Sequence, residues 1–324
     1  MRRCVEISRQ SCRLSVRDEQ LCVEPRDPPG DGGNDRRIPF EDLGLLIVDH
    51  PHTTYTHSVL IKLAEHGGAL VVCGRNHLPC GLFLPFAGNS ALLERLDLQI
   101  HASLPRKKRI WQALVAAKIR AQARNLSHEP LVRERLMSLS RRVRSGDPDN
   151  LEAQASQIYW PALFRDLGGV ESPFRRIPGG GEGKGPNALL DYGYAVLRAG
   201  LGRAIVSAGL LPALGVAHHN RANPFCLADD LIEPLRPMVD GKVRMLVARS
   251  AVVLDQSTKG ELVALQWQTV RMRNEAGPLS AGLSRYAASF VQALAGEGDL
   301  VIPEPVGVPE NNGEGPRGEE SPWS

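Results

Sequence analysis

The residues best suited to chemistry lie in one stretch, HHNRANPFCLADDLIE, which spans residues 218–233. A histidine pair, His218 and His219, precedes a polar loop and then a predicted helix that carries Asp230 and Glu233. If that helix begins near Asp230, the two acids lie at i, i+3 on one face, and the loop can fold a histidine back onto them. Imidazole and carboxylate without thiolate suit Mn²⁺ or Mg²⁺. The stretch therefore predicts a metal site, although such acid pairs also occur on solvated helix faces and at helix N-termini.

A further candidate carboxylate, Glu152, lies at the start of a predicted helix in the segment DNLEAQASQIYWPALF. A carboxylate at this position is stabilised by the helix dipole, so Glu152 taken alone has an ordinary structural explanation. The Gly-rich loop before the next long apolar helix lacks the spacing G-x-x-x-x-G-K-[ST] of a P-loop. No phosphate-cradling nucleotide site is predicted there.

A strongly basic segment runs over residues 105–145 and contains twelve Lys or Arg residues against two acids, Glu129 and Glu134. A solvated helix face normally mixes the two signs of charge, and this segment hardly does. We therefore expect a surface for a polyanion, whose phosphates would be bound without reading of sequence. The residues expected to bind nucleic acid are Arg106, Lys107, Lys108, Arg141, Arg142 and Arg144.

The elements that must position these residues differ between the two parts of the chain. Before about residue 85, RCVEIS and CRLSVRDEQLCVEP read as short strands with an Asp-Glu-Gln turn, and LGLLIVD and ALVVCG read as buried strands around one helix. After about Ser90 the apolar period becomes helical, with further helices expected at 150–167, 188–208, 230–238 and 279–295. The fold class is therefore α+β, a small β-rich domain followed by a larger all-α domain.

The domain boundaries follow from these composition changes. We expect a β-rich domain over 1–85, a linker over 86–98, a helical domain over 99–302 that carries the candidate metal site and the basic segment, and a disordered acidic tail over 303–324. A Pro/Gly/Asp-rich loop from Pro25 to Arg37 is expected to be mobile. The tail carries five Glu and one Arg, a net charge of −4, so the +3 of the whole chain leaves about +7 on residues 1–302.

The composition narrows the class of protein. Hydrophobic residues are 42% and charged residues 23%, and the longest apolar run, 199–217, contains Arg203 and Pro212. That run indicates a buried helix rather than a membrane span. The six cysteines form no C-x-x-C pair, and the N-terminus has no signal-peptide pattern, so we expect reduced thiols in a cytoplasmic protein.

Three motifs, in this order, resemble the CRISPR-associated adaptation integrases, the Cas-one family. They are E-x-x-A-x-x-x-Y beginning at Glu152, then PNALLDYGYA, then GVAHHNRANPFCLADDLIEPLRP. The segments RKKRIWQALVAAKIRAQA and HPHTTYTHSVLIKLAEHGGALVVCGRNHLPCGLFLPF are similar to the type II branch of that family. The similarity covers roughly residues 1–300, and three ordered motifs are far more specific than any one of them.

The resemblance implies a β-sandwich-like N-terminal domain, concerned with dimerisation and partner contacts, and a helical catalytic domain. It implies a Mg²⁺- or Mn²⁺-dependent DNA endonuclease and integrase with the ligands Glu152, His218 and Glu233, and with Asp230 as a further acid. His218 is preferred because similar sequences place their single histidine twelve residues before the Asp that matches Asp230. His219 would then support the ligands without binding the metal ion, face DNA or be structural.

The resemblance also implies partners: double-stranded DNA as foreign fragments and CRISPR repeat, a second copy of the chain, and the small Cas-two protein in a heterohexamer. Two other functions remain open at this point, a metal-dependent DNA repair nuclease and a non-catalytic DNA-binding scaffold of the same fold. Branched strand-transfer products would separate an integrase from a plain nuclease, and metal titration would separate an enzyme from a scaffold.

Overall fold

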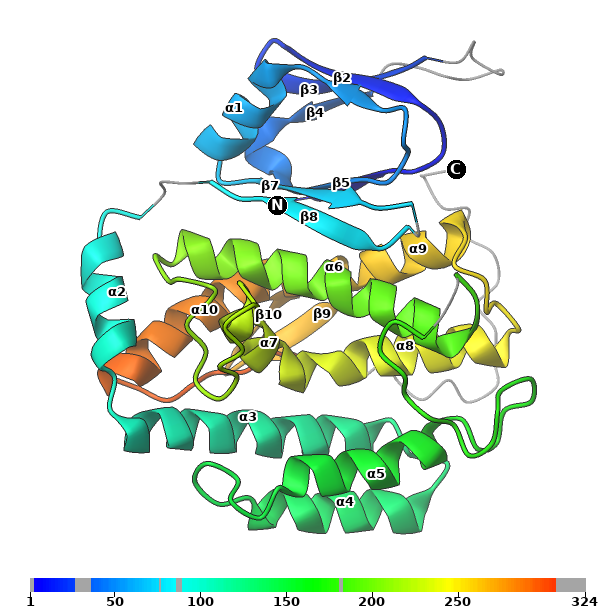
Figure 1. Ribbon diagram of the computed structural model, residues 1–324, viewed down its shortest axis with the longest axis vertical. Helices are drawn as coiled ribbons and strands as arrows, with labels where there is room; N and C mark the ends of the chain where they lie inside the picture. The colour runs from blue at the N-terminus through cyan, green and yellow to red at the C-terminus, as the bar shows by residue number, and fades with distance from the viewer. Residues whose placement is uncertain (1–2, 27–35, 76, 86–88, 181–182, 307–324) are drawn as a thin grey trace.

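The computed structural model of this 324-residue protein describes residues 3–26, 36–75, 77–85, 89–180 and 183–306 (Figure 1). A small β-rich part lies above a larger, mostly helical part, as the sequence predicted (Figure 1). The expected mobile loop falls largely on residues 27–35, and most of the expected acidic tail falls on 307–324, so both lie outside the described residues.

The β-rich part contains two four-stranded sheets that face each other. One sheet has the order β1-β5-β7-β8 and consists of Arg3–Ile7, Leu43–Val48, Ala69–Cys73 and Pro79–Phe83. The other has the order β4-β3-β2-β6 and consists of Arg36–Pro39, Gln20–Pro25, Cys12–Arg17 and Thr54–Tyr55. A 3₁₀ turn, η1 (Phe40–Asp42), and helix α1 (His57–Glu65) complete this part. The predicted hairpin is β2–β3, and its turn residues Asp18 and Glu19 have φ angles of 50° and 58°.

Strand β5 shows why a continuous apolar run was required. All six of its residues are buried, because the strand has a hydrophobic core on each side. Leu46 and Val48 belong to the core between the two sheets, whereas Leu45 and Ile47 belong to the core shared with the helices. Strand β7 alternates in the same way, so the sheet containing β5 and β7 is the floor on which the helical part packs.

The helical part is built around α6, a long helix that contacts α7, α8, α9 and α10. Its helices are α2 (Leu92–His101), α3 (Leu104–Arg124), α4 (Pro130–Arg142), α5 (Leu151–Leu163), α6 (Gly185–Ser207), α7 (Cys226–Ile232), α8 (Arg236–Ala248), α9 (Gln256–Val263) and α10 (Leu279–Ala295). Two 3₁₀ turns, η2 (Glu233–Leu235) and η3 (Ala264–Trp267), follow α7 and α9. At Gly193 of α6, a Cβ atom would lie 2.4 Å from Val239 Cγ1, so this glycine permits the close approach of α8.

The structure differs from the sequence-based expectation in three places. The helical part also contains a three-stranded sheet of β9 (Thr269–Met272), β10 (Glu275–Pro278) and β11 (Glu304–Pro305), so it is not all-α. Strand β11 lies inside the range expected to be tail, because it pairs with β9. The range 86–98, expected to be a linker, contains the first residues of α2.

A buried polar cluster joins the β-rich part to the helices. Lys259 of α9 donates to Asp49 Oδ2 at 2.5 Å, and both side chains are almost fully buried. The Nδ1 atom of His77 lies 3.0 Å from Asp49 Oδ1. Tyr192 of α6 donates to Glu6 of β1 at 3.1 Å. Because these contacts cross between β1, β5, α6 and α9, they fix the two parts against each other.

Two predictions from the composition concern membrane spans and the cysteines, and both can be compared with the structure. Among the described residues, no helix is both long enough and apolar enough to cross a membrane. The six cysteines are unpaired.

Candidate active site

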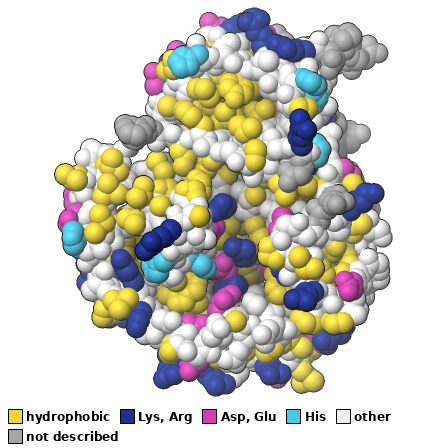
Figure 2. Space-filling model, in the orientation of Figure 1, with side chains coloured by type: hydrophobic (Ala, Val, Ile, Leu, Met, Phe, Trp, Pro, Cys, Tyr) yellow, Lys and Arg dark blue, Asp and Glu magenta, His cyan; other side chains and the backbone are white. Residues whose placement is uncertain are grey.

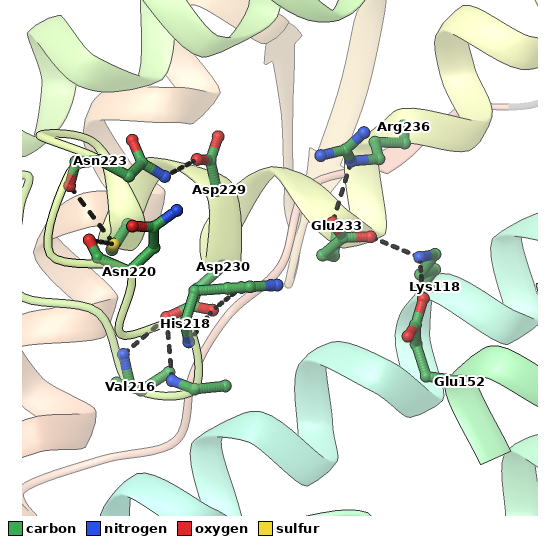
Figure 3. Close-up of polar contacts among 12 residues, drawn as sticks. Lys118, Glu152, Val216, His218, Asn220, Asn223, Asp229, Asp230, Glu233 and Arg236 are labelled. Carbon is green, nitrogen blue, oxygen red and sulfur yellow. Dashed lines mark hydrogen bonds and ion pairs between the residues drawn. The ribbon is translucent and has the colours of Figure 1, made fainter. Parts of the chain in front are cut away.

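Helix α3 brings two of the predicted ligands together through a residue that was not predicted, Lys118. Its ammonium group donates to Glu152 Oε1 in the first turn of α5, and its Nζ atom lies 2.5 Å from Glu233 Oε2 at the start of η2 (Figure 3). The Lys118 side chain is only 10% exposed. Two carboxylates that are far apart in the sequence therefore meet around one positive charge.

The environment of Glu233 keeps it ionised in spite of burial. Its Oε1 atom lies 3.0 Å from Arg236 Nε, one helical turn further on (Figure 3). Burial alone would raise the pKa of Glu233, but the charges of Lys118 and Arg236 bring the pKa below its ordinary value. Oε2 of Glu233 is shielded from solvent and has no well-aligned hydrogen bond, and the cation nearest to it is the Lys118 ammonium group.

His218 is held by a cradle around Asp230. Oδ1 of this fully buried carboxylate accepts from the His218 backbone N–H at 3.1 Å and contacts the imidazole Nδ1 at 2.6 Å. Oδ2 accepts the backbone N–H groups of Val216 and Ala217 at 2.6 and 3.0 Å. Gly215 makes the cradle possible, because a Cβ there would lie 2.7 Å from Asp230 Oδ2. The contact leaves Nε2 as the imidazole nitrogen available to a ligand.

Two features of the surroundings act on the His218 ring. The hydrogen bond to Asp230, and after it the charges of nearby acids including Glu233, raise the pKa of His218 above its ordinary value. Trp111 of α3 packs edge-on against the imidazole at a centroid distance of 5.7 Å. Trp111 and Lys118 are seven residues apart, two turns of α3, so one face of this helix lines the whole site.

The expectation that this helix begins near Asp230 is wrong. The helix begins at Cys226, so Asp230 lies in its last turns and points to the 216–218 loop, while Glu233 lies beyond it and points to α3. Asp229 in turn pairs with Arg198 of α6 at 2.7 Å. The three acids of this stretch thus have three different partners.

The geometry brings Glu152 and Glu233 together and places His218 beside them, within electrostatic range of Glu233. Within the part of the chain that the structure describes, no three His, Cys, Asp or Glu side chains converge closely enough to hold a metal ion. The donor set nevertheless fits a divalent cation, because two carboxylates already enclose a positive charge and one buried carboxylate oxygen has no well-aligned hydrogen bond. Figure 2 shows acidic, basic and histidine side chains gathered in the middle of this face of the helical part.

A buried aspartate, Asp240 of α8, lies near the site and hydrogen-bonds two tyrosines rather than the candidate ligands. Tyr159 donates to its Oδ2 at 3.0 Å and Tyr194 donates to its Oδ1, while Asn125 donates to the Tyr159 hydroxyl at 2.9 Å. Burial, only partly offset by these hydrogen bonds, raises the pKa of Asp240 to about 7. Arg236 packs over the Tyr194 ring at 4.8 Å, so this network supports the side chain that pairs with Glu233.

Asp240→Asn should reduce the pH dependence of stability. Because the folded-state pKa is raised, the stabilising contribution of Asp240 is complete below its unfolded pKa near 4 and is lost as pH rises through about 7. The difference in thermal midpoint, variant minus unmodified protein, should therefore be more favourable to the variant at about pH 8 than at about pH 5. The control is Asp299→Asn, an exposed residue after α10. An equal offset for Asp240→Asn at both pH values would contradict the prediction.

The six residues expected to bind nucleic acid occupy different settings. Lys108, Arg141, Arg142 and Arg144 are exposed, whereas Arg106 and Lys107 are half-buried. Arg106 donates to the Leu294 carbonyl at 2.7 Å, and Arg144 pairs with Asp149 at 2.7 Å. Lys118, which the sequence placed in the basic segment, is buried between the two glutamates and does not belong to the surface.

A groove of about 430 Å³ lies between α3, α4 and the segment 300–304. Its charged lining consists of Arg109, Arg120, Arg141 and Glu304. On α3, Arg109 and Arg120 lie about half a turn around the helix axis from Lys118. The groove and the carboxylate pair are therefore on opposite sides of α3.

The sequence analysis missed the residues that complete the site from α3 and α8. Lys118 was counted with its basic neighbours, although Ala117 and Ile119 beside it are apolar and signal a buried position. Arg236 and Trp111 had no signal of their own, because their role depends on which helices pack together.

A carboxylate pair and a histidine on helices, in a protein that also carries exposed arginines on α3 and α4, are typical of enzymes that act on nucleic-acid phosphodiesters with a divalent ion. Residues 5–272 match the family described as CRISPR associated protein Cas1. The CRISPR-associated endonuclease Cas1 of Neisseria meningitidis serogroup C is 35% identical over 298 residues, which cover 90% of this chain and 93% of the relative.

Solved structures share the fold at lower identity. A casposase bound to integration product has a TM-score of 0.75 at 18% identity, covering 92% of each chain. The Cas1 protein of Thermotoga maritima has a TM-score of 0.71 at 17% identity, covering 91% of this chain and 98% of that one. A chain of a Cas6-RT-Cas1–Cas2 complex has a TM-score of 0.72 at 17% identity, covering 91% of this chain and 35% of that one.

The chain belongs to the Cas1 family of CRISPR-associated proteins, the endonucleases and integrases of CRISPR spacer acquisition. The family resemblance and the α+β fold expected from the sequence are confirmed. Enzymes of this family typically use a divalent metal ion.

Proposed function

We propose that this protein joins the 3′-hydroxyl ends of short duplex DNA to a CRISPR repeat array by transesterification, and hydrolyses DNA when water replaces the hydroxyl. The observation that carries the proposal is the meeting of Glu152 and Glu233 around one positive charge beside His218 (Figure 3). Exchange of one phosphodiester for another is nearly thermoneutral and needs no nucleotide cofactor, which agrees with the missing P-loop motif.

Glu152, His218 and Glu233 would hold a Mg²⁺ or Mn²⁺ ion, His218 through Nε2. When bound, the ion neutralises negative charge that develops on the phosphodiester. Asp230 orients His218 through Nδ1 and is saturated by backbone N–H groups, so we assign it positioning rather than metal binding. Arg236 holds Glu233 in place. His219 is exposed, and we propose that it supports the ligands without binding the metal ion, faces DNA or is structural.

DNA would be bound by the exposed cations at the ends of α3 and α4. Lys108, Arg141 and Arg142 are exposed and therefore free to meet phosphates. Arg144 is already paired with Asp149, and Arg106 is tied to a backbone carbonyl, so both should contribute less than the sequence suggested.

Removing Arg141 and Arg142 together should weaken duplex binding and flatten its salt dependence. The slope of log K against log salt is negative, and each lost phosphate contact reduces its magnitude by about 0.9, so the slope of the double alanine variant should be smaller in magnitude by about 1.8. Duplex affinity measured by fluorescence anisotropy over a salt series checks this. Arg249→Ala, an exposed arginine paired with Glu261 beyond α8, is the control. An unchanged slope in the double variant would exclude Arg141 and Arg142 from the DNA surface.

The partners follow from the same proposal. Two strand ends must be joined at two sites, so we propose a homodimer of this chain through the β-rich part, with the small Cas2 protein completing a heterohexamer. A structural neighbour is part of a complex that contains Cas2. We also propose that the chain is of the type II branch and acts in the cytoplasm. A Cas2-type gene and a repeat array beside its gene would support the assignment.

A strand-transfer assay tests the proposed reaction. Short duplexes with 3′-hydroxyl ends are incubated with the protein, Cas2, Mn²⁺ or Mg²⁺, and a supercoiled plasmid that carries a repeat. We expect covalent branched products, and none when the duplex ends are 3′-dideoxy, because the nucleophile is then missing. Plasmid nicking without branched products under all conditions would leave the protein a plain nuclease.

A further inference from the structure

We propose that Lys118 is an internal counter-ion of the active site, and that binding of a divalent cation displaces its ammonium group from between Glu152 and Glu233. The inference rests on the metal site of the proposed function. It adds a residue that controls how tightly the metal ion binds.

The first argument is electrostatic. Glu233 is buried with 7% of its surface exposed, and a single nitrogen, Lys118 Nζ, contacts both Glu233 and Glu152. Two carboxylates this close repel each other, and burial increases the cost of leaving them unpaired. Without a metal ion the pair therefore requires another cation, and Lys118 supplies it.

The second argument concerns space and mobility. A metal ion bound by both carboxylates would have to occupy the position that the ammonium group now holds, so the two cations exclude each other there. The ammonium group of Lys118 lies at the end of a flexible four-carbon chain, and it binds carboxylates as a compact point charge rather than through a fixed geometry. Arg236, in contrast, is packed over the Tyr194 ring and can remain beside Glu233. Lys118 is thus the cation that moves.

The third argument concerns the direction and consequence of that movement. The Glu152 side chain is 29% exposed, against 9% for Glu233, so the site opens on the Glu152 side. An ammonium group leaving in that direction reaches solvent next to the bound ion. The divalent cation would replace the single charge of the ammonium group with a double charge, while Lys118 stays nearby. The site would then be more positive and better suited to bind a phosphodiester anion.

Chemical labelling of the unmodified full-length protein tests the displacement directly. Lysines are acetylated with an amine-reactive reagent, with and without Mn²⁺, and the rate at each lysine is measured by mass spectrometry. Lys118 should react at least about tenfold faster with Mn²⁺, because the ion shifts the population toward the displaced ammonium. Lys259, buried against Asp49, should stay protected in both conditions, and exposed Lys108 should react in both. Equal protection of Lys118 with saturating Mn²⁺ would overturn the proposal.

Lys118→Met provides an independent measurement by isothermal titration calorimetry. Loss of the competing cation should lower the Mn²⁺ dissociation constant by about tenfold, whereas Lys118→Arg, which keeps the charge, should not lower it. In chelator the methionine variant should unfold at a lower temperature than the unmodified protein, and Mn²⁺ should restore it. Equal or weaker Mn²⁺ binding by Lys118→Met would refute the counter-ion role.

The outcomes separate this inference from the proposed function. If the unmodified protein does not bind Mn²⁺, or if Glu152→Ala binds it equally well, the proposed metal site itself fails. If Mn²⁺ binds at Glu152 but Lys118→Met binds no tighter, only the counter-ion role fails. A methionine variant that folds in neither condition leaves the decision to the labelling of the unmodified protein.

Discussion

Glu152→Ala should reduce strand transfer at least about a thousandfold, which corresponds to about 4 kcal/mol of barrier. Glu152 is one of the two carboxylates that meet at the candidate metal position, so its loss removes a ligand and weakens both metal binding and charge neutralisation. Duplex affinity should stay within about twofold, because the basic surface of α4 is unchanged. Branched products and duplex binding are measured on the same preparation.

Two further variants make this prediction specific. Glu152→Gln preserves the shape of the side chain, so loss of transfer in both variants excludes a packing effect. Glu134→Ala removes an exposed glutamate of α4 and should transfer normally. His218→Ala should lose strand transfer as Glu152→Ala does, because it removes the imidazole that Asp230 holds in place. Normal integration by Glu152→Ala or His218→Ala would show that the assigned ligands are wrong.

Asp49→Ala should destabilise the fold by about 3–5 kcal/mol, because it leaves the Lys259 ammonium group buried without its partner. Lys259 and Asp49 are 5% and 2% exposed, so water cannot replace the lost carboxylate without opening the structure. The loss should appear as a lower thermal midpoint and a lower midpoint of urea unfolding, measured with metal absent so that binding does not contribute.

A double variant separates the pair from the packing around it. In Asp49→Ala with Lys259→Met, no unpaired ammonium remains, and most of the lost stability should return. Asp42→Ala, which removes a partly exposed acid of η1, should cost far less. If Asp49→Ala changes stability no more than Asp42→Ala, this ion pair does not hold the β-rich part to α9.

The position of Asp49 links the β-rich part to the helices that carry the candidate active site. Asp49 follows β5, whose alternate residues pack against the helices, and Lys259 lies in α9, which packs against α6. Helix α6 contacts both α7 and α8, the helices on either side of Glu233. We therefore expect loosening of the interface to lower integrase activity through the position of Glu233, without loss of any ligand.

Local patterns in the sequence determined the elements and the candidate ligands. Short alternating segments predicted β2 and β3, continuous apolar runs predicted β5 and β7, and a helical period predicted α5, α6 and α10, because these patterns depend only on nearby residues. Ordered motifs around Glu152, His218 and Glu233 identified the family. The short strands β9–β11 were missed, because each is too short to show a clear alternation of apolar and polar residues.

Only the tertiary structure decided how the ligands are arranged. The sequence spacing placed Asp230 and Glu233 three residues apart, but only the packing decided that Asp230 contacts the 216–218 loop and Glu233 contacts Lys118 of α3. Lys118 looked like one more basic surface residue until the packing of α3 against α5 and η2 buried it between two carboxylates. Charge in a sequence does not reveal burial, since burial depends on which distant helices pack together.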